Sequence, residues 1–587
     1  MDTNNISRRA FVALAGSAGA AAAGAGLVGC NAAGGGNGSG NSESSAGVPA
    51  TTPADKLPLP EKGKVYINEQ PRDNIKDGGT LTLAISEIGP DWNKTSVNGN
   101  TAYMSTLWNK MAPLLWLWSP DGSEIKPNPD YVESCDVSEE SGKEVVTIKM
   151  NPKAVFNDGT PMDVEAFKTA WMTGNGKDER FTPASTDGVE LIESVEKGAG
   201  DHEVVITFST PAYPPQAFID VMHPANQDPE VYTKGWVNNP HNEWQAGPFV
   251  VDSFDDAHVT FKPNPQWWGD SPKLDEVTYK QMDAQAAINA FKNGETDAAA
   301  AAYLEQLQNY STTEDAEIRR AFADSLACYE LNTTRGALQD IVVRKAFCQC
   351  FDPKIDLSIS YKGVSWDEDR LGSIVMYPWQ AGYENNLPDD VKKLDGASSE
   401  DRAKAARKTL EDAGYALDGD YYAKDGVQAA FSLDSFGDSA TGKSLDAAVQ
   451  KMAKDAGIKI DIKTHPASDF SKVVNSGDFD MIGIRWGGSP TGYDFGYQLY
   501  GSDSPSNFTH AGSPEADKLF NQVLGESDNK KQVELCNEAE KKALELYAIV
   551  PNQNGPDGMV VKKGLANYGP CLLQTLLPQN IGWQKEN

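Results

Sequence analysis

Runs rich in β-branched and aromatic residues alternate with helical segments along most of this chain, and this alternation constrains its fold more than any other feature. FVVDSF (249–254), HVTFK (258–262) and EVTYKQM (276–282) are β-rich runs separated by turns. VRKAFCQCF (343–351) is typical of a helix, and DFDMIGIRW (478–486) of a strand. Strands that alternate with helices predict an α/β fold. At 587 residues and 39% hydrophobic content, the chain should form more than one domain, each with its own core.

The first thirty residues indicate export. SRRAFVALAG carries Arg8 and Arg9 ahead of a short apolar run that ends in small residues, which is typical of a secretory signal. A membrane span would need about 20 strongly apolar residues. The paired arginines resemble those of substrates of the twin-arginine route, and Leu27-Val28-Gly29-Cys30 resembles the lipobox of bacterial lipoproteins. We therefore expect residues 1–29 to be a signal peptide and Cys30 to be lipidated, so that the protein is held on the extracellular face of the cell membrane. The alternative is a buried, alanine-rich helix with a chance cysteine.

Residues 30–74 are expected to be the lipidated cysteine and a flexible linker. The stretch from 31 to about 60 is Gly, Ser, Asn and Pro with almost nothing apolar to bury. Some thirty such residues span roughly 30 Å on average. The folded part should therefore stay near the membrane and yet be free to turn.

GDSATGKS (437–444) has the letter pattern of a phosphate-binding P-loop, and it lies between an expected strand and an expected helix. Two observations oppose nucleotide binding. ATP is scarce outside the cytoplasm, and no clear strand ends in the Asp that would hold magnesium. The simpler interpretation is a connecting turn, followed by a helix that packs on a sheet through Leu445, Val449, Met452 and Ala456.

The charge and the cysteine pattern exclude several classes of function. The chain carries a net charge of −32, and loss of residues 1–29 would leave 50 basic and 83 acidic residues, or −33. Such an acidic protein would repel nucleic acid and anionic membrane surfaces, so we expect no nucleic-acid partner. Apart from Cys30, six cysteines remain, and in an oxidising compartment they could form disulfides. There is no CxxC pair, no HExxH and no Gly-x-Ser-x-Gly, so we expect no metal, no cofactor and no enzymatic activity.

Phrases spread over nearly the whole chain after residue 75 resemble family 5 of the extracellular solute-binding proteins, which deliver peptide-type solutes to ABC importers. They occur in the order that is typical of that family. They are GGTLTLAISEIGPDWNKTS (78–96), VFNDGTPMDVEAFKTAW (155–171), the Gly-Pro strand and Asn-Pro-x-x-Trp segment (247–279), AINAFKNGETDAA (287–299), the Asn strand and following helix (331–356), the Gly-Ile strand with its Trp-centred strand end (456–489) and the tail 529–553.

The resemblance implies a periplasmic-binding-protein type II-like fold, with two lobes joined by a hinge and one extra inserted domain. Carried onto this sequence, the first lobe would take residues 75–102, 223–330 and 564–587. The inserted domain would take 103–222, and the second lobe 331–563. The P-loop-like segment then lies inside the second lobe.

The resemblance also implies a ligand site between the lobes. In peptide-binding members, extended ligand backbone pairs with segments of both lobes. The matching residues are Ser86, Glu87 and Ile88 after the first strand, and Arg485, Trp486, Gly487, Gly488 and Ser489 at the end of a strand in the second lobe. Trp486 would be either a cleft wall or a core aromatic. Arg485 could meet a ligand carboxylate, although strand alternation makes it face away from Trp486.

One position departs from the family's pattern. Peptide binders usually carry an Asp three residues after the tryptophan, to pair with the ligand's α-ammonium, and here that position is Ser489. A neutral hydroxyl lacks the charge-assisted bond that a carboxylate provides. Asp494 either replaces that Asp or is a solvated loop carboxylate. The loop also offers Tyr493, Phe495, Tyr497 and Tyr500, which would contact ligand or simply pack the loop, and we expect packing for at least two of them.

The function predicted from these features is capture of a peptide-like solute by a lipid-anchored protein, with delivery to the permease and ATPase subunits of an ABC importer. One alternative keeps the fold and changes the ligand to an oligosaccharide or another solute. A second alternative is a cell-surface regulatory protein that has lost transport, since fold alone does not separate these functions.

Overall fold

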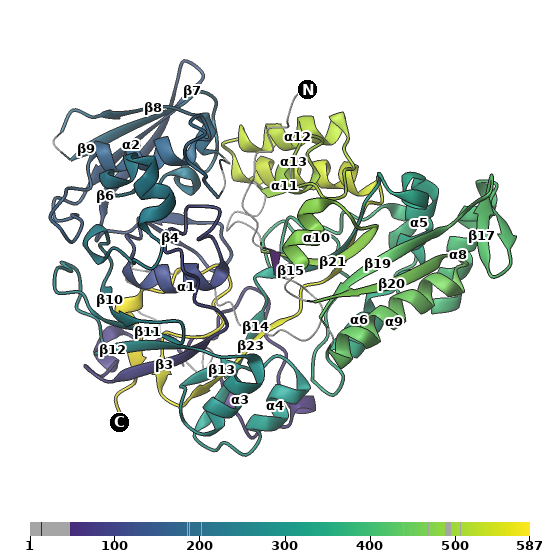
Figure 1. Ribbon diagram of the computed structural model, residues 1–587, viewed down its shortest axis with the longest axis horizontal. Coiled ribbons are helices and arrows are strands. Elements are labelled where there is room, and N and C mark those ends of the chain that lie inside the picture. Colours follow the sequence, from purple (N-terminus) through teal and green to yellow (C-terminus); the bar gives the residue numbers. More distant parts are fainter. Residues whose placement is uncertain are drawn as a thin grey trace.

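The computed structural model describes residues 13–14, 47–184, 186, 188–200, 202–437, 439–466, 469–487, 495–504 and 506–586. Its described strands form sheets of eight, six and four strands, and three smaller sheets of two or three strands, with helices packed against the larger ones (Figure 1). The predicted α/β fold is confirmed.

Lobe I is the eight-stranded sheet with its helices, on the left and bottom of Figure 1. Its strand order is β10-β11-β12-β3-β13-β23-β14-β2. Alternate residues of β3, Leu81, Leu83 and Ile85, are buried, as a period of two requires of a strand with one face on the core. The strands are β2 (Val48–Pro49), β3 (Thr80–Ile85), β10 (Phe249–Phe254), β11 (His258–Pro263), β12 (Glu276–Gln281), β13 (Ala298–Ala300), β14 (Ala316–Phe322) and β23 (Pro556–Lys562), and the helices are α1 (Ala102–Met111), α3 (Ala284–Lys292) and α4 (Leu304–Tyr310).

The inserted domain is the antiparallel sheet β6-β7-β9-β8 with helix α2, above lobe I in Figure 1. The DGTP turn enters α2 as the sequence predicts: Gly159 has φ +90°, and the Asp163 side chain caps the helix by accepting from Glu165 N. The elements are β6 (Val132–Glu140), β7 (Lys143–Met150), α2 (Val164–Gly174), β8 (Ile192–Lys197) and β9 (Glu203–Phe208), next to the short pair β4 (Trp116–Trp118) and β5 (Ile125–Pro127).

Lobe II is the mixed sheet β20-β19-β21-β15-β22 with its helices, on the right of Figure 1. Its strands are β15 (Ser325–Leu331), β19 (Ala430–Phe436), β20 (Lys459–His465), β21 (Met481–Gly487) and β22 (Ile549–Gln553). Its helices are α5 (Ile341–Cys350), α6 (Pro353–Ser360), α7 (Asp389–Lys392), α8 (Ser399–Asp412), α9 (Ala440–Asp455), α10 (Phe470–Ser476), α11 (Gly496–Tyr500), α12 (Pro514–Leu524) and α13 (Asn529–Leu544). Three short strands, β16 (Ala416–Asp418), β17 (Tyr421–Lys424) and β18 (Val427–Gln428), project from its edge, and β24 (Leu565–Ala566) pairs with β25 (Gly582–Trp583) near the C-terminus.

After residue 47, the described part of the chain passes between the two lobes at two segments that are bonded to each other. Ala323 and Asp324 join β14 to β15, and Asn554 and Gly555 join β22 to β23. The Asn554 side chain donates to Ala323 O and Ser325 O, both at 2.8 Å, so the two crossings are bonded to each other. The chain thus passes from one sheet to the other at 323–324 and at 554–555, a few residues before the predicted lobe borders at 330/331 and 563/564.

The P-loop-like segment is a connecting turn, as predicted. Only three residues separate the end of β19 at Phe436 from the start of α9 at Ala440, so Gly442, Lys443 and Ser444 already lie in the helix. The Ser439 side chain accepts from Gly442 N and so caps the helix. No loop remains to cradle a phosphate with backbone N–H groups. On the inner side of α9, Val449, Met452 and Ala456 are buried, and Leu445 is partly buried.

Candidate ligand-binding site

The loop after β3 presents free side chains at the carboxyl end of the lobe I sheet. Ser86 and Glu87 are exposed and Ile88 is partly buried. The Ile88 backbone N–H donates to Gln281 Oε1 at 2.8 Å, which fixes the loop to the end of the neighbouring strand β12. This backbone contact positions the loop, and the Glu87 side chain is exposed to solvent.

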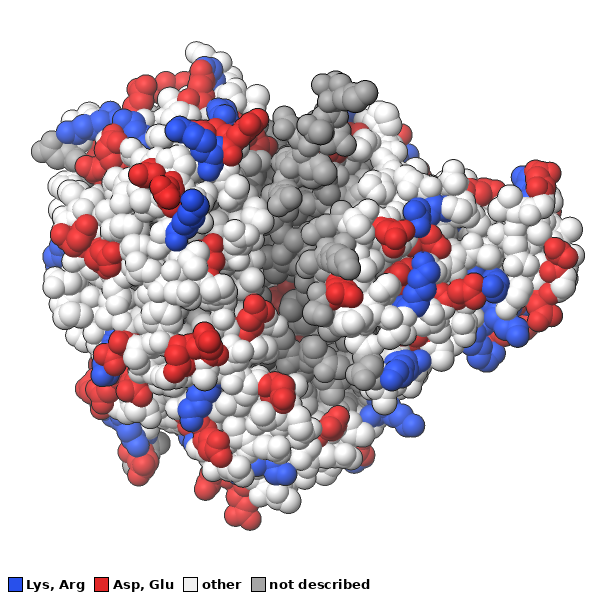
Figure 2. Space-filling model, in the orientation of Figure 1, with Lys and Arg blue, Asp and Glu red and all other residues white. Residues whose placement is uncertain are grey.

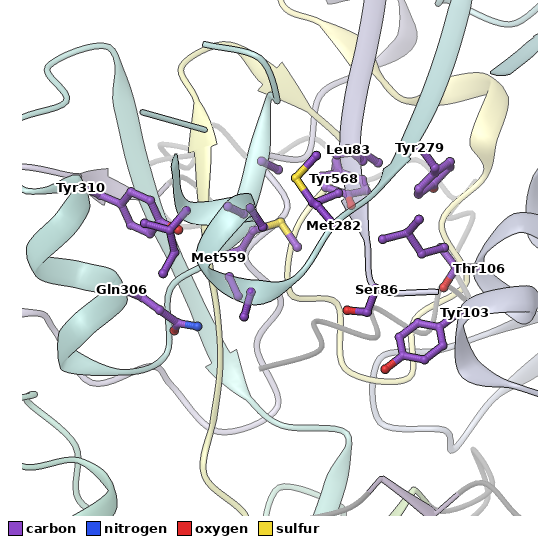
Figure 3. A pocket seen from close by; sticks show the side chains of 18 residues that line it. Leu83, Ser86, Tyr103, Thr106, Tyr279, Met282, Gln306, Tyr310, Met559 and Tyr568 are labelled. Atoms are coloured by element: carbon purple, nitrogen blue, oxygen red, sulfur yellow. The ribbon is translucent and has the colours of Figure 1, made fainter. Parts of the chain in front are cut away.

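A pocket of about 810 Å³, open to solvent, lies beside this loop. Figure 3 shows Ser86 and Tyr103 on one side of it, Gln306 and Tyr310 on the other, and Met282 and Met559 between them. Burial raises the pKa of the Tyr103 phenol, and a hydrogen bond with Ser86 partly opposes that rise. The pocket thus combines apolar walls with a few hydroxyl and amide groups, the composition expected of a small-solute site.

In lobe II, the neighbouring strand β19 covers only the first part of one edge of strand β21. β15 pairs with β21 along its whole length, from Leu331↔Met481 to Ser325↔Gly487. On the other side, β19 pairs with β21 only at Met481 and Ile482. Beyond this point β1 (Ala13–Leu14), from near the start of the chain, pairs antiparallel with Arg485 and Trp486. This edge of β21 therefore accepts an extended segment as an added strand.

The Arg485 side chain is bound to the lobe crossings. Its guanidinium donates to Ser325 Oγ and to Ser325 O, both at 3.2 Å, and to Asn554 O. Across the same crossing, the Glu368 carboxylate accepts from Asn554 N and Gly555 N, both at 2.9 Å. The second crossing is thus held from both sides, through its N–H groups and through its carbonyl.

Trp486 lies in the core of lobe II, with 2% of its surface exposed. Its indole Nε1 donates to Glu330 Oε1 at 2.8 Å, and its ring stacks on Phe508 at a centroid distance of 5.9 Å. Burial raises the pKa of the Glu330 carboxyl to about 7. The structure thus places this tryptophan in the core arrangement, and its contact with a ligand stays a prediction.

Several predicted residues lie outside the described part of the chain: Gly488, Ser489, Tyr493, Asp494 and the lipidation site Cys30. Gly487 is the last residue of β21. Of the loop aromatics, Phe495 and Tyr500 are buried; Phe495 packs on Trp486 and Tyr500 on Phe520, which confirms packing for two of them.

Tyr103, Glu368 and Asn554 are not among the site residues predicted from the sequence. For Asn554 the sequence does carry a turn signal, because Asn554-Gly555 is an Asn-Gly pair between two β-rich runs. In the structure Gly555 has φ +80°, as such a turn requires. Glu368 lies in an irregular segment far from the crossings in sequence, so nothing local marked it.

Within the described ranges, no group of three His, Cys, Asp or Glu side chains is arranged to hold a metal ion. Cys135, Cys328, Cys348, Cys350, Cys536 and Cys571 are all free thiols. In the same part of the chain, no helix is both long and apolar enough to span a bilayer. On the face drawn in Figure 2, basic and acidic side chains are intermingled over both halves of the molecule.

Two α/β lobes joined by paired crossing segments, with a strand edge that takes up an added strand in one and a solvent-open pocket in the other, are typical of a two-lobed ligand-binding protein. The profile of the bacterial extracellular solute-binding proteins, family 5 (middle region), matches residues 126–508. The chain belongs to this family, as the resemblance predicted, and therefore to a class of binding proteins rather than of enzymes.

Relatives with known roles support the same assignment. The chain is 29% identical over 528 residues to the oligopeptide-binding protein OppA of Mycobacterium tuberculosis, covering 88% of this chain and 87% of that protein. It is 22% identical to the periplasmic oligopeptide-binding protein OppA of Salmonella typhimurium, with 78% and 85% covered.

Solved structures show the same fold. The periplasmic EDTA-binding protein EppA superposes with a TM-score of 0.77 at 22% identity, covering 87% of this chain and 98% of its own. The oligopeptide-binding protein AppA of Bacillus subtilis, in complex with a nonapeptide, superposes with a TM-score of 0.69 at 18% identity, covering 87% and 100%. The predicted type II-like fold is thereby confirmed.

Proposed function

We propose that this protein captures peptides between its lobes and delivers them to the permease and ATPase subunits of an ABC importer. The observation that carries the proposal is the edge of β21 beyond its pairs with β19, where a short extended segment of the chain pairs antiparallel with Arg485 and Trp486. A peptide ligand would take that position by strand addition, and its main chain would supply the hydrogen bonds.

The side chains at this edge favour a ligand that is recognised by its backbone. Arg485 is committed to Ser325 and Asn554, and Trp486 to Glu330. Because lobe II would then contribute mostly N–H and C=O groups, its part of the affinity would depend little on peptide sequence. Side-chain preference would come from lobe I, through the pocket beside Ser86 and Tyr103.

The names of the relatives support a peptide ligand, since the Mycobacterium and Salmonella proteins are both oligopeptide-binding proteins. Closure of the two lobes would follow ligand binding, because a ligand that contacts both lobes gains contacts only in the closed state.

Export and anchoring are a separate part of the proposal. The twin arginines Arg8 and Arg9 would direct export by the twin-arginine route, and cleavage after Gly29 would leave Cys30 for lipidation. Cleavage would also remove Ala13 and Leu14 from the edge of β21 and leave it open for ligand. Cys30→Ser should release the protein into the medium and abolish incorporation of labelled fatty acid. Retention of the serine variant in the membrane fraction would contradict the anchor.

Native mass spectrometry of the protein, purified gently from its own cells, tests the ligand class directly. A ladder of short peptides released from the protein is the expected result. Hexose-spaced masses would replace the proposal with sugar uptake. If no ligand co-purifies, titration with a pool of random peptides follows, and absence of any bound peptide at millimolar concentration contradicts the proposal.

N-methylation of a bound peptide tests main-chain recognition. Methyl groups at alternate amides should weaken binding about 2- to 12-fold for each N–H that pairs with β21, because one hydrogen bond contributes about 0.5–1.5 kcal/mol. Methylation of the intervening amides is the matched control and should have little effect. Equal effects at every position would argue against pairing along a single strand edge.

A further inference from the structure

A second pocket, of about 1080 Å³ and open to solvent, lies between α1, β4 and the segment that leads out of the inserted domain around residue 220. Its walls carry the indole rings of Trp108, Trp116, Trp236 and Trp244. It shares no lining residue with the pocket beside Ser86, so it is a separate cavity. None of the residues predicted from the sequence to bind ligand lines it.

Lys94 and Asp220 bring opposite charges to this pocket. No ion pair or hydrogen bond joins them among the described residues, since the Asp220 carboxylate accepts only from Val221 N, at 2.8 Å. Lys94 is partly buried, whereas the Asp220 side chain is exposed at the mouth of the pocket. Desolvation lowers the pKa of Lys94 and raises that of Asp220, and the charge of each group opposes the shift of the other. Lys94 and Asp220 thus line the same pocket with opposite charges and do not form an ion pair with each other.

The remaining titratable group of the lining, His223, is already engaged. Its Nε2 lies 3.1 Å from Asp158 Oδ2 and 3.3 Å from Thr160 Oγ1, and its Nδ1 accepts from Ala225 N. Its ring stacks on Trp244 at a centroid distance of 5.3 Å. His223 therefore supports the wall of the pocket, and the charges available to an incoming group are those of Lys94 and Asp220.

We propose that this pocket binds a dipolar group of the ligand, with Lys94 on its anionic part, Asp220 on its cationic part and the tryptophan rings against its carbon skeleton. A ligand that brings both complementary charges can form charge-assisted hydrogen bonds with the Lys94 amine and the Asp220 carboxylate at the same time. Indole faces suit both the methylene groups and the cation of such a ligand. The inference rests on the proposed capture of peptides and adds to it a subsite of stated chemistry.

A peptide can supply this dipole in two ways. The first is a terminal residue, whose α-ammonium or α-carboxylate acts together with an oppositely charged side chain. The second is an internal pair of neighbouring charged side chains. A free zwitterionic amino acid has the same chemistry and provides the simplest probe.

The test is isothermal titration of the purified protein and two isosteric variants, Lys94→Met and Asp220→Asn. The probes are Ala-Ala-Ala-Lys with free ends, the same peptide C-amidated, an acetylated and amidated peptide with an internal Lys-Glu pair, and free lysine. Lys153→Met and Asp136→Asn make the same charge changes at exposed sites away from the pocket and serve as controls. Melting temperatures check that every variant is folded.

We expect Lys94→Met to weaken binding of the free-ended tetrapeptide at least tenfold and to leave the C-amidated peptide within twofold. Asp220→Asn should weaken binding of both Ala-Ala-Ala-Lys and its C-amidated form at least tenfold. The two control variants should leave the affinity for every probe unchanged. If only the doubly blocked peptide responds to the two variants, the dipole comes from side chains; if only the free-ended probes respond, it comes from a terminal residue. Either result supports the subsite.

Peptide binding that both pocket variants leave within twofold for every probe overturns the subsite and leaves the proposed function standing. Binding of free lysine that depends on Lys94 and Asp220, without binding of any peptide, supports the subsite and contradicts peptide capture. Absence of all binding to the wild-type protein contradicts both.

Discussion

The two lobes differ in the groups that they present to a ligand, although each carries one of the segments that the sequence predicts to bind it. After β3 in lobe I, Ser86 and Glu87 are exposed, and Ser86 lines an open pocket. On β21 in lobe II, Arg485 is bonded to the lobe crossings and Trp486 to a buried glutamate. Lobe II thus presents a backbone edge, whereas lobe I and the inserted domain present side chains and pockets. This difference suggests that one lobe supplies sequence-independent affinity and the other supplies selectivity.

The largest expected effect comes from removing Trp486. Trp486→Ala should lower the free energy of unfolding by about 3–5 kcal/mol, because it leaves a cavity in the core of lobe II and removes the indole donor to Glu330. Tyr103→Ala, which truncates a partly buried aromatic of lobe I, is the control and should cost far less. Chemical denaturation measures both. A Trp486→Ala protein with wild-type stability and lost ligand binding would mean that this residue is a cleft wall, and the contrast between the lobes would disappear.

The pH dependence of lobe II should follow its buried carboxyls. Burial raises the pKa of Glu330 from 4.5 to about 7, so in the folded state this group keeps its proton at pH values where the unfolded chain loses it. Its stabilising contribution is complete below pH 4.5 and is lost as the pH rises to 7, by about 3 kcal/mol. Asp356 on α6, whose pKa is also about 7, should add to the same slope.

In the Glu330→Gln variant, the free energy of unfolding should therefore decrease less between pH 4.5 and pH 7 than it does in the wild-type protein. Denaturation at several pH values measures it, with Glu87→Gln at an exposed position as the control. An unchanged slope in the Glu330 variant would show that this carboxyl is ionised in the folded protein.

Lobe I should show the opposite pH dependence at one site. Lys110 on α1 is 2% exposed, and its amine has no hydrogen-bond partner among the described residues. Burial lowers its pKa to about 8, so the folded protein gives up this proton while the unfolded chain still holds it, and stability rises between pH 8 and 10.5. Lys110→Met should raise the unfolding free energy at pH 7 by about 1–3 kcal/mol and remove that rise. Equal or lower stability of the methionine variant would show that the amine is paired in solution.

The sequence could predict those features that depend on local patterns. Turn residues and helix caps marked the entry to α2, and the short connection before α9 made the P-loop pattern a turn. The alternation along β21 also showed that Arg485 and Trp486 face opposite ways. It could not show what each one meets, because the partners of Arg485 are 160 and 69 residues away in the chain. The pocket with Lys94 and Asp220 escaped prediction for the same reason, since only the folded chain brings these two residues together.

The smallest expected effect concerns a single hydroxyl of lobe I. Tyr103→Phe removes the phenol that bonds to Ser86 at the rim of the pocket and keeps the ring. Peptide affinity should fall about 2- to 12-fold, the contribution of one hydrogen bond, while the melting temperature stays the same. Tyr279→Phe is the matched control, because that hydroxyl is buried beside the same pocket without a partner among the described residues; its loss should leave affinity unchanged and stability equal or slightly higher. If the two variants bind peptide equally well, the Tyr103 hydroxyl takes no part in recognition, and selectivity in lobe I must come from the shape of its pockets.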